Sequence, residues 1–178
     1  MANLIREFSY DKKRVNEVGP DRAAAEWIVR CEGKIKFDKF KDYISDYNDL
    51  VRITAMIDPA KPAQQVYLEA IDASDAIISG YGSYYFRGLK HLHDVKFIRC
   101  RNWPDWGFEI MGDAVGEHVK NLRIESCPKI SEKGIRYLTK FSALKTLTLL
   151  DLELKNKDQL LQELEQALPS CDIKSPFC

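Results

Sequence analysis

The stretch Val119-Lys-Asn-Leu-Arg-Ile-Glu-Ser-Cys-Pro-Lys-Ile-Ser-Glu-Lys-Gly-Ile-Arg-Tyr-Leu138 decides the fold. Its first half alternates apolar and polar residues, which favours a short strand with Leu122 and Ile124 on one face. Cys127 follows at the point where the chain leaves the strand. Its second half spaces Ile130, Ile135 and Leu138 as one apolar side of a helix would. A single strand, turn and helix cannot bury these side chains alone, so the pattern predicts neighbours of the same kind.

The same residue classes recur at regular distances along the chain. Shifts of 27 residues toward the N-terminus predict one unit with Val95, Phe97 and Cys100 and another with Leu68, Ala70 and Ala73, and a shift of 25 toward the C-terminus predicts a unit with Leu147, Leu149 and Leu152. The glycines Gly80, Gly107 and Gly134 share the same spacing. Four such units predict an α/β fold, a leucine-rich-repeat solenoid of the cysteine-containing type over residues 63–178.

Residues 1–62 lack the repeat, and we expect them to form a mainly helical N-terminal cap over the first unit. Asp11–Val18 favours a short helix, Asp21 a cap for a second one, and Lys34–Phe37 a strand. Apolar residues within 40–47 recur at helical spacing and predict another helix. An F-box is an alternative for such a block, but its Leu-Pro opening is absent.

Composition narrows the classes of function. The chain has 178 residues, with 27 Lys and Arg against 27 Asp and Glu, so its net charge is zero. That balance disfavours a nucleic-acid binder or polybasic attachment to anionic lipid. No stretch of about 18 apolar residues predicts a transmembrane segment. The start, Met1 to Arg14, contains Glu7 and Asp11 and matches a targeting presequence poorly.

The titratable residues indicate no enzyme. No phosphate-binding loop, GxSxG, HExxH or kinase signature is present. His91-x-His93 is a weak metal motif, and a solvated turn is the favoured interpretation. The five cysteines are odd in number and lack CxxC spacing, which favours reduced thiols. Cys100 and Cys127 occupy equivalent corner positions, where buried inert thiols are favoured over a reactive pair.

A partner-binding surface is expected on the concave side of the sheet, where side chains alternate with the buried ones. The predicted exposed rows contain charged and apolar residues, a combination that suits a protein-docking site. Ordinary cross-strand pairs, or cover by the N-terminal block, remain alternatives. The candidate docking residues are Glu69, Ile71, Lys96, Ile98, Arg123, Glu125 and Leu150.

Three blocks carry a family resemblance: Val18-Gly-Pro-Asp-Arg-Ala-Ala-Ala-Glu-Trp-Ile-Val-Arg-Cys31, Ala70-Ile-Asp-Ala-Ser74 and Ile130-Ser-Glu-Lys-Gly-Ile135. Over residues 13–170 the chain resembles ATP synthase subunit s, or coupling factor B, a family also called distal membrane arm assembly component 2-like. The resemblance implies a non-catalytic, peripheral protein on the matrix side of the mitochondrial inner membrane. It would associate with the membrane sector of ATP synthase, limit proton leak and support energy coupling. An assembly factor for respiratory complex I is the alternative role, and a cytosolic repeat adaptor for ubiquitin ligation is another.

The resemblance also implies two sites. The first is a structural magnesium ion (Mg²⁺) held by the main-chain carbonyls of Glu32 and Ser74, with Glu32 at a position where the family has glycine. The second is a CxC thiol pair, of which Ile98-Arg99-Cys100 keeps only the second cysteine, so a packing role is favoured for Cys100. The family's tryptophan-rich amino terminus does not match Met1–Tyr10.

Overall fold

The computed structural model describes residues 9–175 as an α/β fold with one six-stranded sheet. This confirms the α/β class. The cap contributes α2 (Lys12–Val18), α3 (Pro20–Arg30), β1 (Lys34–Phe37), α4 (Tyr47–Ala55) and the 3₁₀ turn η1 (Pro62–Gln64). The rest of the chain forms β2 (Leu68–Asp72), η2 (Gly80–Phe86), β3 (Asp94–Ile98), α5 (Asp105–Val115), β4 (Asn121–Glu125), α6 (Glu132–Arg136), η3 (Tyr137–Lys140), β5 (Thr146–Leu150), α7 (Lys157–Ala167) and β6 (Asp172–Lys174).

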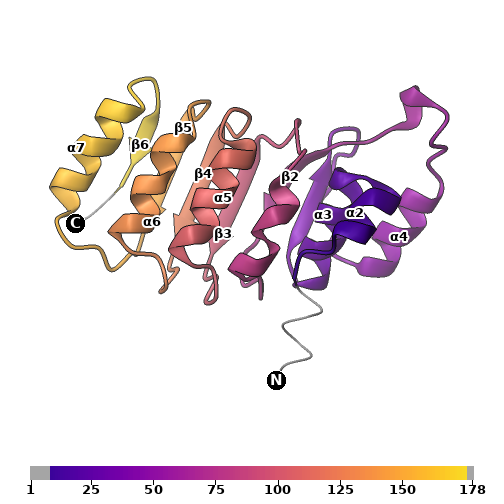
Figure 1. Cartoon of the computed structure of the whole chain (residues 1–178), viewed down its shortest axis with the longest axis horizontal. Coiled ribbons are helices and arrows are strands. Elements are labelled where there is room, and N and C mark those ends of the chain that lie inside the picture. Colours follow the sequence, from indigo (N-terminus) through magenta and orange to yellow (C-terminus); the bar gives the residue numbers. More distant parts are fainter. Residues whose placement is uncertain (1–8, 176–178) are drawn as a thin grey trace.

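The strands lie in chain order from β1 to β6. Strands β2 to β6 are parallel to one another, and β1 pairs with β2 in the antiparallel direction. Figure 1 shows α3, α5, α6 and α7 side by side along one face of this sheet. Each of the strands β2 to β5 is followed by a helical segment that returns the chain to the start of the next strand, as parallel pairing requires.

One continuous cluster of buried apolar side chains lies between the sheet and the helices, from Ala23 in α3 to Leu168 after α7. Its centre is aromatic: the Phe97 and Trp103 rings lie 4.8 Å apart between centroids, and Phe108 packs against both. All three side chains are fully buried, and each contributes roughly 2–3 kcal/mol by leaving water. The strands and helices are therefore held as one body by a shared core.

The predicted spacing of the first unit was wrong by three residues. Ala70 pairs with Asp94 and Asp72 with Lys96, an offset of 24 residues rather than 27. The equivalent residues after β2 to β5 share a positive φ, and they give the same result for the first unit: Asp75 precedes Arg99 by 24 residues. Arg99 precedes Ser126 by 27 residues, and Ser126 precedes Asp151 by 25. The connection through η2 is a seven-residue 3₁₀ segment, whereas the next unit has the eleven-residue helix α5. Leu68 still faces the core, so its apolar side chain gave no sign of this three-residue slip in the repeat spacing.

The third predicted helix of the N-terminal block was misplaced. Strand β1 is the predicted strand over Lys34–Phe37 and extends the sheet, but no helix covers residues 40–46. Instead Ile44 exchanges two backbone hydrogen bonds with Ile35, at 3.0 and 2.7 Å, on the outer edge of β1. These bonds satisfy backbone groups that a helix would otherwise pair. Helix α4 begins only at Tyr47, where the Asp46 carboxylate accepts a hydrogen bond from the Asp49 amide.

Candidate docking face of the sheet

In the described part of the chain, no helix covers the face of the sheet opposite α3, α5, α6 and α7 (Figure 1). Parallel sheets are usually covered on both faces, so a bare face is a candidate binding surface. We call this surface the open face. Cross-strand pairing sets its central row as Asp72, Lys96, Arg123, Thr148 and Lys174, and the row beside it as Ala70, Asp94, Asn121, Thr146 and Asp172.

The structure brings most of the predicted docking residues together. Lys96 and Arg123 are paired neighbours, as are Ile98 and Glu125, and Leu150 follows Glu125 on β5. All five side chains are exposed or half-buried.

The two candidates on β2 do not occupy the predicted rows. Ile71 pairs with the buried Val95 and is 1% exposed, so the prediction that it lies on the docking surface was wrong. The cause is the three-residue slip, which moves Ile71 from the exposed row into the core. Glu69 is half-buried and lies near β1, where its carboxylate forms a 3.4 Å ion pair with Lys36.

A hollow of about 370 Å³ lies on the open face, over the middle of β3 to β5. Its polar lining comes from Lys96, Arg123, Asn121, Asp94, Thr146 and Thr148. Tyr43, a residue that sequence reasoning placed on a helix, contributes to the lining from the segment before α4. Burial, together with the nearby carboxylates of Asp72, Asp94 and Glu69, raises the pKa of Tyr43 above its usual value. Tyr43 therefore stays a neutral phenol that can donate a hydrogen bond.

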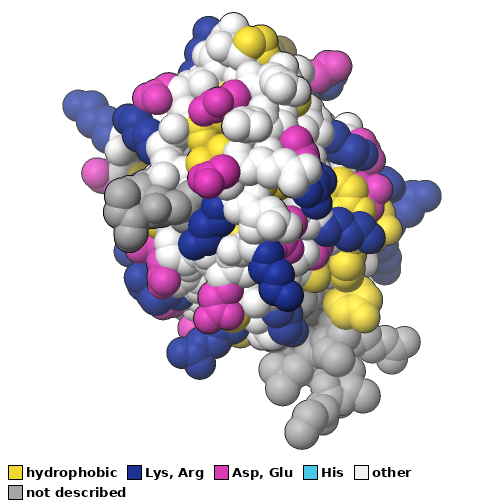
Figure 2. Space-filling view, turned by 90° about the vertical axis from the view of Figure 1, so that its left-hand side faces the viewer, with side chains coloured by type: hydrophobic (Ala, Val, Ile, Leu, Met, Phe, Trp, Pro, Cys, Tyr) yellow, Lys and Arg dark blue, Asp and Glu magenta, His cyan; other side chains and the backbone are white. Residues whose placement is uncertain are grey.

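Charges on this surface are mixed rather than of one sign. Arg123 binds the Glu125 carboxylate through Nε at 2.9 Å and Nη2 at 2.5 Å, and Asn121 donates to Asp94 at 2.5 Å. Figure 2 shows the same interspersion of acidic and basic side chains at the end of the molecule formed by α7 and β6. Acidic and basic side chains thus alternate over short distances on this surface, in line with the zero net charge of the chain.

The first of the three blocks that carry the family resemblance, from Val18 to Cys31, fixes the cap to the sheet. Asp21 lies in the first turn of α3, and its Oδ1 accepts a 2.8 Å hydrogen bond from the backbone amide of Leu68 at the start of β2. Asp21 is therefore not the helix cap that was predicted, because Gly19 occupies that position. Burial raises the pKa of Asp21. Trp27, two turns on, stacks on Tyr85 of η2 with ring centroids 5.3 Å apart.

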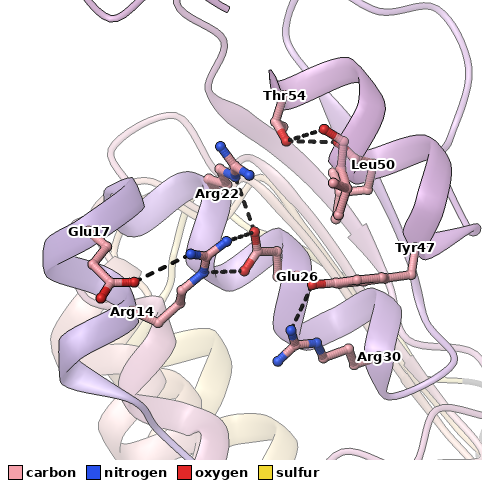
Figure 3. A network of polar contacts seen from close by, with 9 residues as sticks. Arg14, Glu17, Arg22, Glu26, Arg30, Tyr47, Leu50 and Thr54 are labelled. Atoms are coloured by element: carbon pink, nitrogen blue, oxygen red, sulfur yellow. Dashed lines mark hydrogen bonds and ion pairs between the residues drawn. The ribbon is translucent and has the colours of Figure 1, made fainter. Parts of the chain in front are cut away.

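Glu26 is the centre of a polar network in the cap (Figure 3). Its carboxylate is 2% exposed and binds Arg14 of α2 through two 2.8 Å contacts and Arg22 through one of 3.1 Å. Burial by itself would raise the pKa of Glu26, but hydrogen bonds and charge from Arg14 and Arg22 outweigh it and lower the pKa. Beside it, the Arg30 guanidinium donates to the Tyr47 hydroxyl at 2.7 Å and joins α3 to α4. This network has a structural role that the sequence pattern did not predict.

The cysteines Cys100 and Cys127 lie in the core at the ends of β3 and β4. Cys100 is 0% exposed, and its Sγ contacts the Ala73 carbonyl at 2.9 Å. The neighbouring Cys127 sulfur and burial raise the pKa of Cys100, which favours the neutral thiol. Burial also raises the pKa of Cys31 to about 12. Cys178 lies outside the described residues.

The predicted ion ligands Glu32 and Ser74 lie on two segments that touch. The Ile77 amide donates to the Cys31 carbonyl at 2.8 Å, and a Cβ on Gly33 would lie 3.3 Å from the Asp72 carbonyl oxygen. Glu32 has φ +67°, a backbone conformation that glycine adopts more readily than other residues. Main-chain carbonyl oxygens, the donors predicted at Glu32 and Ser74, suit a hard cation that retains several waters.

Residues 9–175 contain neither a side-chain cluster suited to a metal ion nor a membrane-spanning helix. This part of the chain has no group of three or more His, Cys, Asp and Glu side chains placed to hold a metal. No helix in it is both long and apolar enough to cross a bilayer. His91 is exposed in a turn and stacks on Tyr67, with ring centroids 4.2 Å apart.

The fold and this surface define an α/β protein with a helix-covered parallel sheet, one bare sheet face and a cap that continues the sheet at its first strand. No family model matches the chain. It is 31% identical over 167 residues to "ATP synthase subunit s, mitochondrial" of Bos taurus, covering 92% of this chain and 80% of that protein. The Homo sapiens protein of the same name is 32% identical over 174 residues, covering 96% of this chain and 82% of its own length. The chain belongs to the ATP synthase subunit s family.

Proposed function

We propose that this protein is a non-catalytic accessory protein that binds mitochondrial ATP synthase through the open face of its sheet. The names of its relatives support the partner, and the bare face with its hollow supports the mode of binding. The single observation that carries the proposal is the alignment over more than nine-tenths of the chain.

The finer features follow from the same proposal. We infer that the array is a leucine-rich-repeat solenoid over residues 63–178 with a capping domain over 1–62. The proposed location is the matrix side of the mitochondrial inner membrane, as a peripheral protein that supports energy coupling by limiting proton leak. The main-chain oxygens of Glu32 and Ser74 would hold a Mg²⁺ ion that joins the end of α3 to the end of β2. Such an ion would stabilise the joint between cap and sheet and take no part in catalysis.

Affinity purification from gently solubilised mitochondria tests the partner. We expect ATP synthase subunits to be recovered with the tagged protein, and complex I subunits to be absent. Recovery of complex I assembly intermediates without ATP synthase would favour the assembly-factor role and contradict the proposal.

Changing Ile98 and Arg123 together tests the surface. Both lie on the open face, so the Ile98→Ala/Arg123→Ala variant should capture less ATP synthase while its thermal unfolding stays close to wild type. Unchanged capture with unchanged stability would show that the partner binds elsewhere.

A further inference from the structure

The segment after helix α3 runs beside the end of strand β2. The antiparallel register of β1 and β2 pairs Lys34 with Asp72. Two residues further along in each direction, a continuation of this register brings Glu32 opposite Ser74. The two segments stay in contact there, because a Cβ on Gly33 would lie 3.3 Å from the Asp72 carbonyl oxygen. The two main-chain oxygens proposed as ion ligands therefore belong to facing stretches of backbone.

These stretches of backbone offer acceptors without donors. In a continued ladder the amides of Glu32 and Ser74 would each meet a carbonyl oxygen of the opposite segment. The Glu32 amide instead donates to the Val29 carbonyl at 3.1 Å, and the Ser74 amide donates to Asp72 Oδ1 at 3.0 Å. Neither the Glu32 nor the Ser74 carbonyl oxygen accepts a hydrogen bond from the described residues. Two such oxygens fit a hard cation.

Glu32 itself is an unusual residue for its backbone. Helix α3 ends at Arg30 with Cys31 as its C-cap, and the Gly33 amide donates back to the Ile28 carbonyl at 2.9 Å, as in a Schellman motif. The φ of Glu32 is +67°, where a side chain costs stability relative to glycine. Its side chain is exposed and has no ion-pair or hydrogen-bond partner in residues 9–175. No contact within this part of the chain offsets that cost, and unoffset strain points to a function.

The charge of the Glu32 carboxylate is tethered beside the proposed ion. Covalent geometry keeps the carboxylate carbon of a glutamate within about 6 Å of the carbonyl oxygen of the same residue. A unit charge about 7 Å from a divalent ion in water changes the affinity for that ion about five- to tenfold. Asp72 carries a second carboxylate, fixed on the Ser74 amide and hydroxyl at 3.0 and 2.5 Å, and Lys34 carries the opposing positive charge in register with it. Glu32 is thus the carboxylate that remains free.

We propose that the Glu32 side chain supplies the negative charge that holds Mg²⁺ at the main-chain oxygens of Glu32 and Ser74. Protein sites for Mg²⁺ commonly include one or two carboxylates, and two neutral carbonyl oxygens alone lack that charge. This inference rests on the ion site of the proposed function. It concerns a side chain, whereas that site uses the main chain, so the two can be tested apart.

Calorimetric titration with magnesium chloride at low ionic strength tests the inference, together with thermal unfolding in the presence and absence of Mg²⁺. The variants Glu32→Gln and Glu32→Gly both keep the two main-chain oxygens. We expect each variant to bind Mg²⁺ about five- to tenfold more weakly than wild type. Without Mg²⁺, Glu32→Gly should unfold at a higher temperature than wild type, because it relieves the positive φ. Glu117→Gln, which removes an exposed carboxylate in the turn after α5, is the matched control and should bind Mg²⁺ like wild type.

Equal Mg²⁺ affinity of wild type and Glu32→Gln would overturn this inference and leave the main-chain site standing. An equal loss of affinity in Glu117→Gln would reveal a general effect of net charge and would overturn it too. Absence of Mg²⁺ binding by the wild-type protein would contradict both the ion site and the role of Glu32. Docking on ATP synthase is judged by affinity purification, so its failure leaves the Mg²⁺ result intact.

Discussion

Arg14 and Glu26 join the first two helices through two side-chain contacts of 2.8 Å each, on a carboxylate that is almost fully buried. A buried ion pair is weak support for net stability, but removing one partner leaves an uncompensated buried charge. Arg22 adds a third contact to the same carboxylate. The pair therefore fixes how α2 packs on α3, and through Asp21 and Trp27 the position of α3 against the sheet.

Replacing Glu26 with glutamine should destabilise the protein by about 2–4 kcal/mol, because Arg14 and Arg22 lose their counter-charge. The folded-state pKa of Glu26 is lowered, so its contribution is present above the unfolded pKa of about 4.3 and disappears as pH falls through the folded value. Urea unfolding of both proteins between pH 3 and 7 measures this. Glu17→Gln, which removes an exposed 3.4 Å pair with Arg14, serves as control and should change stability by less than about 1 kcal/mol. A loss for Glu26→Gln no larger than that of the control would contradict the role given to the network.

Replacing Asp21 with asparagine should have the opposite pH dependence. Burial raises the folded-state pKa of Asp21, so its contribution is fully present below the unfolded pKa of about 3.9 and is lost as pH rises through the folded value. Asparagine keeps an oxygen that accepts from the Leu68 amide but does not titrate. The stability of wild type relative to Asp21→Asn should therefore fall as pH rises from about 4. A difference that is constant from pH 4 to 8 would show that the Asp21 pKa is not raised.

Adding a methyl group at Gly82 should destabilise the packing of Trp27 in the cap against η2. A Cβ there would lie 2.2 Å from the Trp27 ring, which is itself held between Tyr85 and Phe86. Gly82→Ala should cost about 1–3 kcal/mol in thermal or urea unfolding. The same change in a Trp27→Leu background should cost less, because the clash is with the indole. Equal losses of stability in both backgrounds would show that the Trp27 indole is not the source of the clash.

The thiols should differ in reactivity according to burial. Cys171 is half-buried, whereas Cys31, Cys100 and Cys127 are buried in the core. In a Cys178→Ser background, Ellman's reagent should label Cys171 first. The three core thiols should react about a hundredfold or more slowly, because they need local opening. Labelling of Cys100 as fast as Cys171 would contradict its packing role and favour a reactive thiol.

Much of the sheet could be predicted from the sequence because alternation is visible locally. The block from Leu122 to Ile124 predicts β4, and the equivalent blocks predict β3 and β5. What remained hidden was the length of the first connection. Since Leu68 and Ile71 are both apolar, either register buries an apolar side chain, and the three-residue slip leaves no local signal.

The cap was less predictable for a different reason. The apolar residues from Phe40 to Tyr47 have helical spacing. The backbone of Ile44, however, forms its hydrogen bonds with Ile35 and not within a helix. One available signal was Asp46 three residues before Asp49, which is typical of a helix start at Tyr47. The Arg14–Glu26 contact joins two helices whose packing no local pattern specifies.

The central claim is that the open face, not the helical face, binds ATP synthase. A photo-crosslinking amino acid placed at Lys96 and, separately, at Lys13 of α2 tests it in intact mitochondria, with mass spectrometry of the adducts. We predict that the probe at Lys96 forms adducts with ATP synthase subunits and that the probe at Lys13 does not. Adducts from Lys13 alone, or none with ATP synthase from either position, would contradict the account.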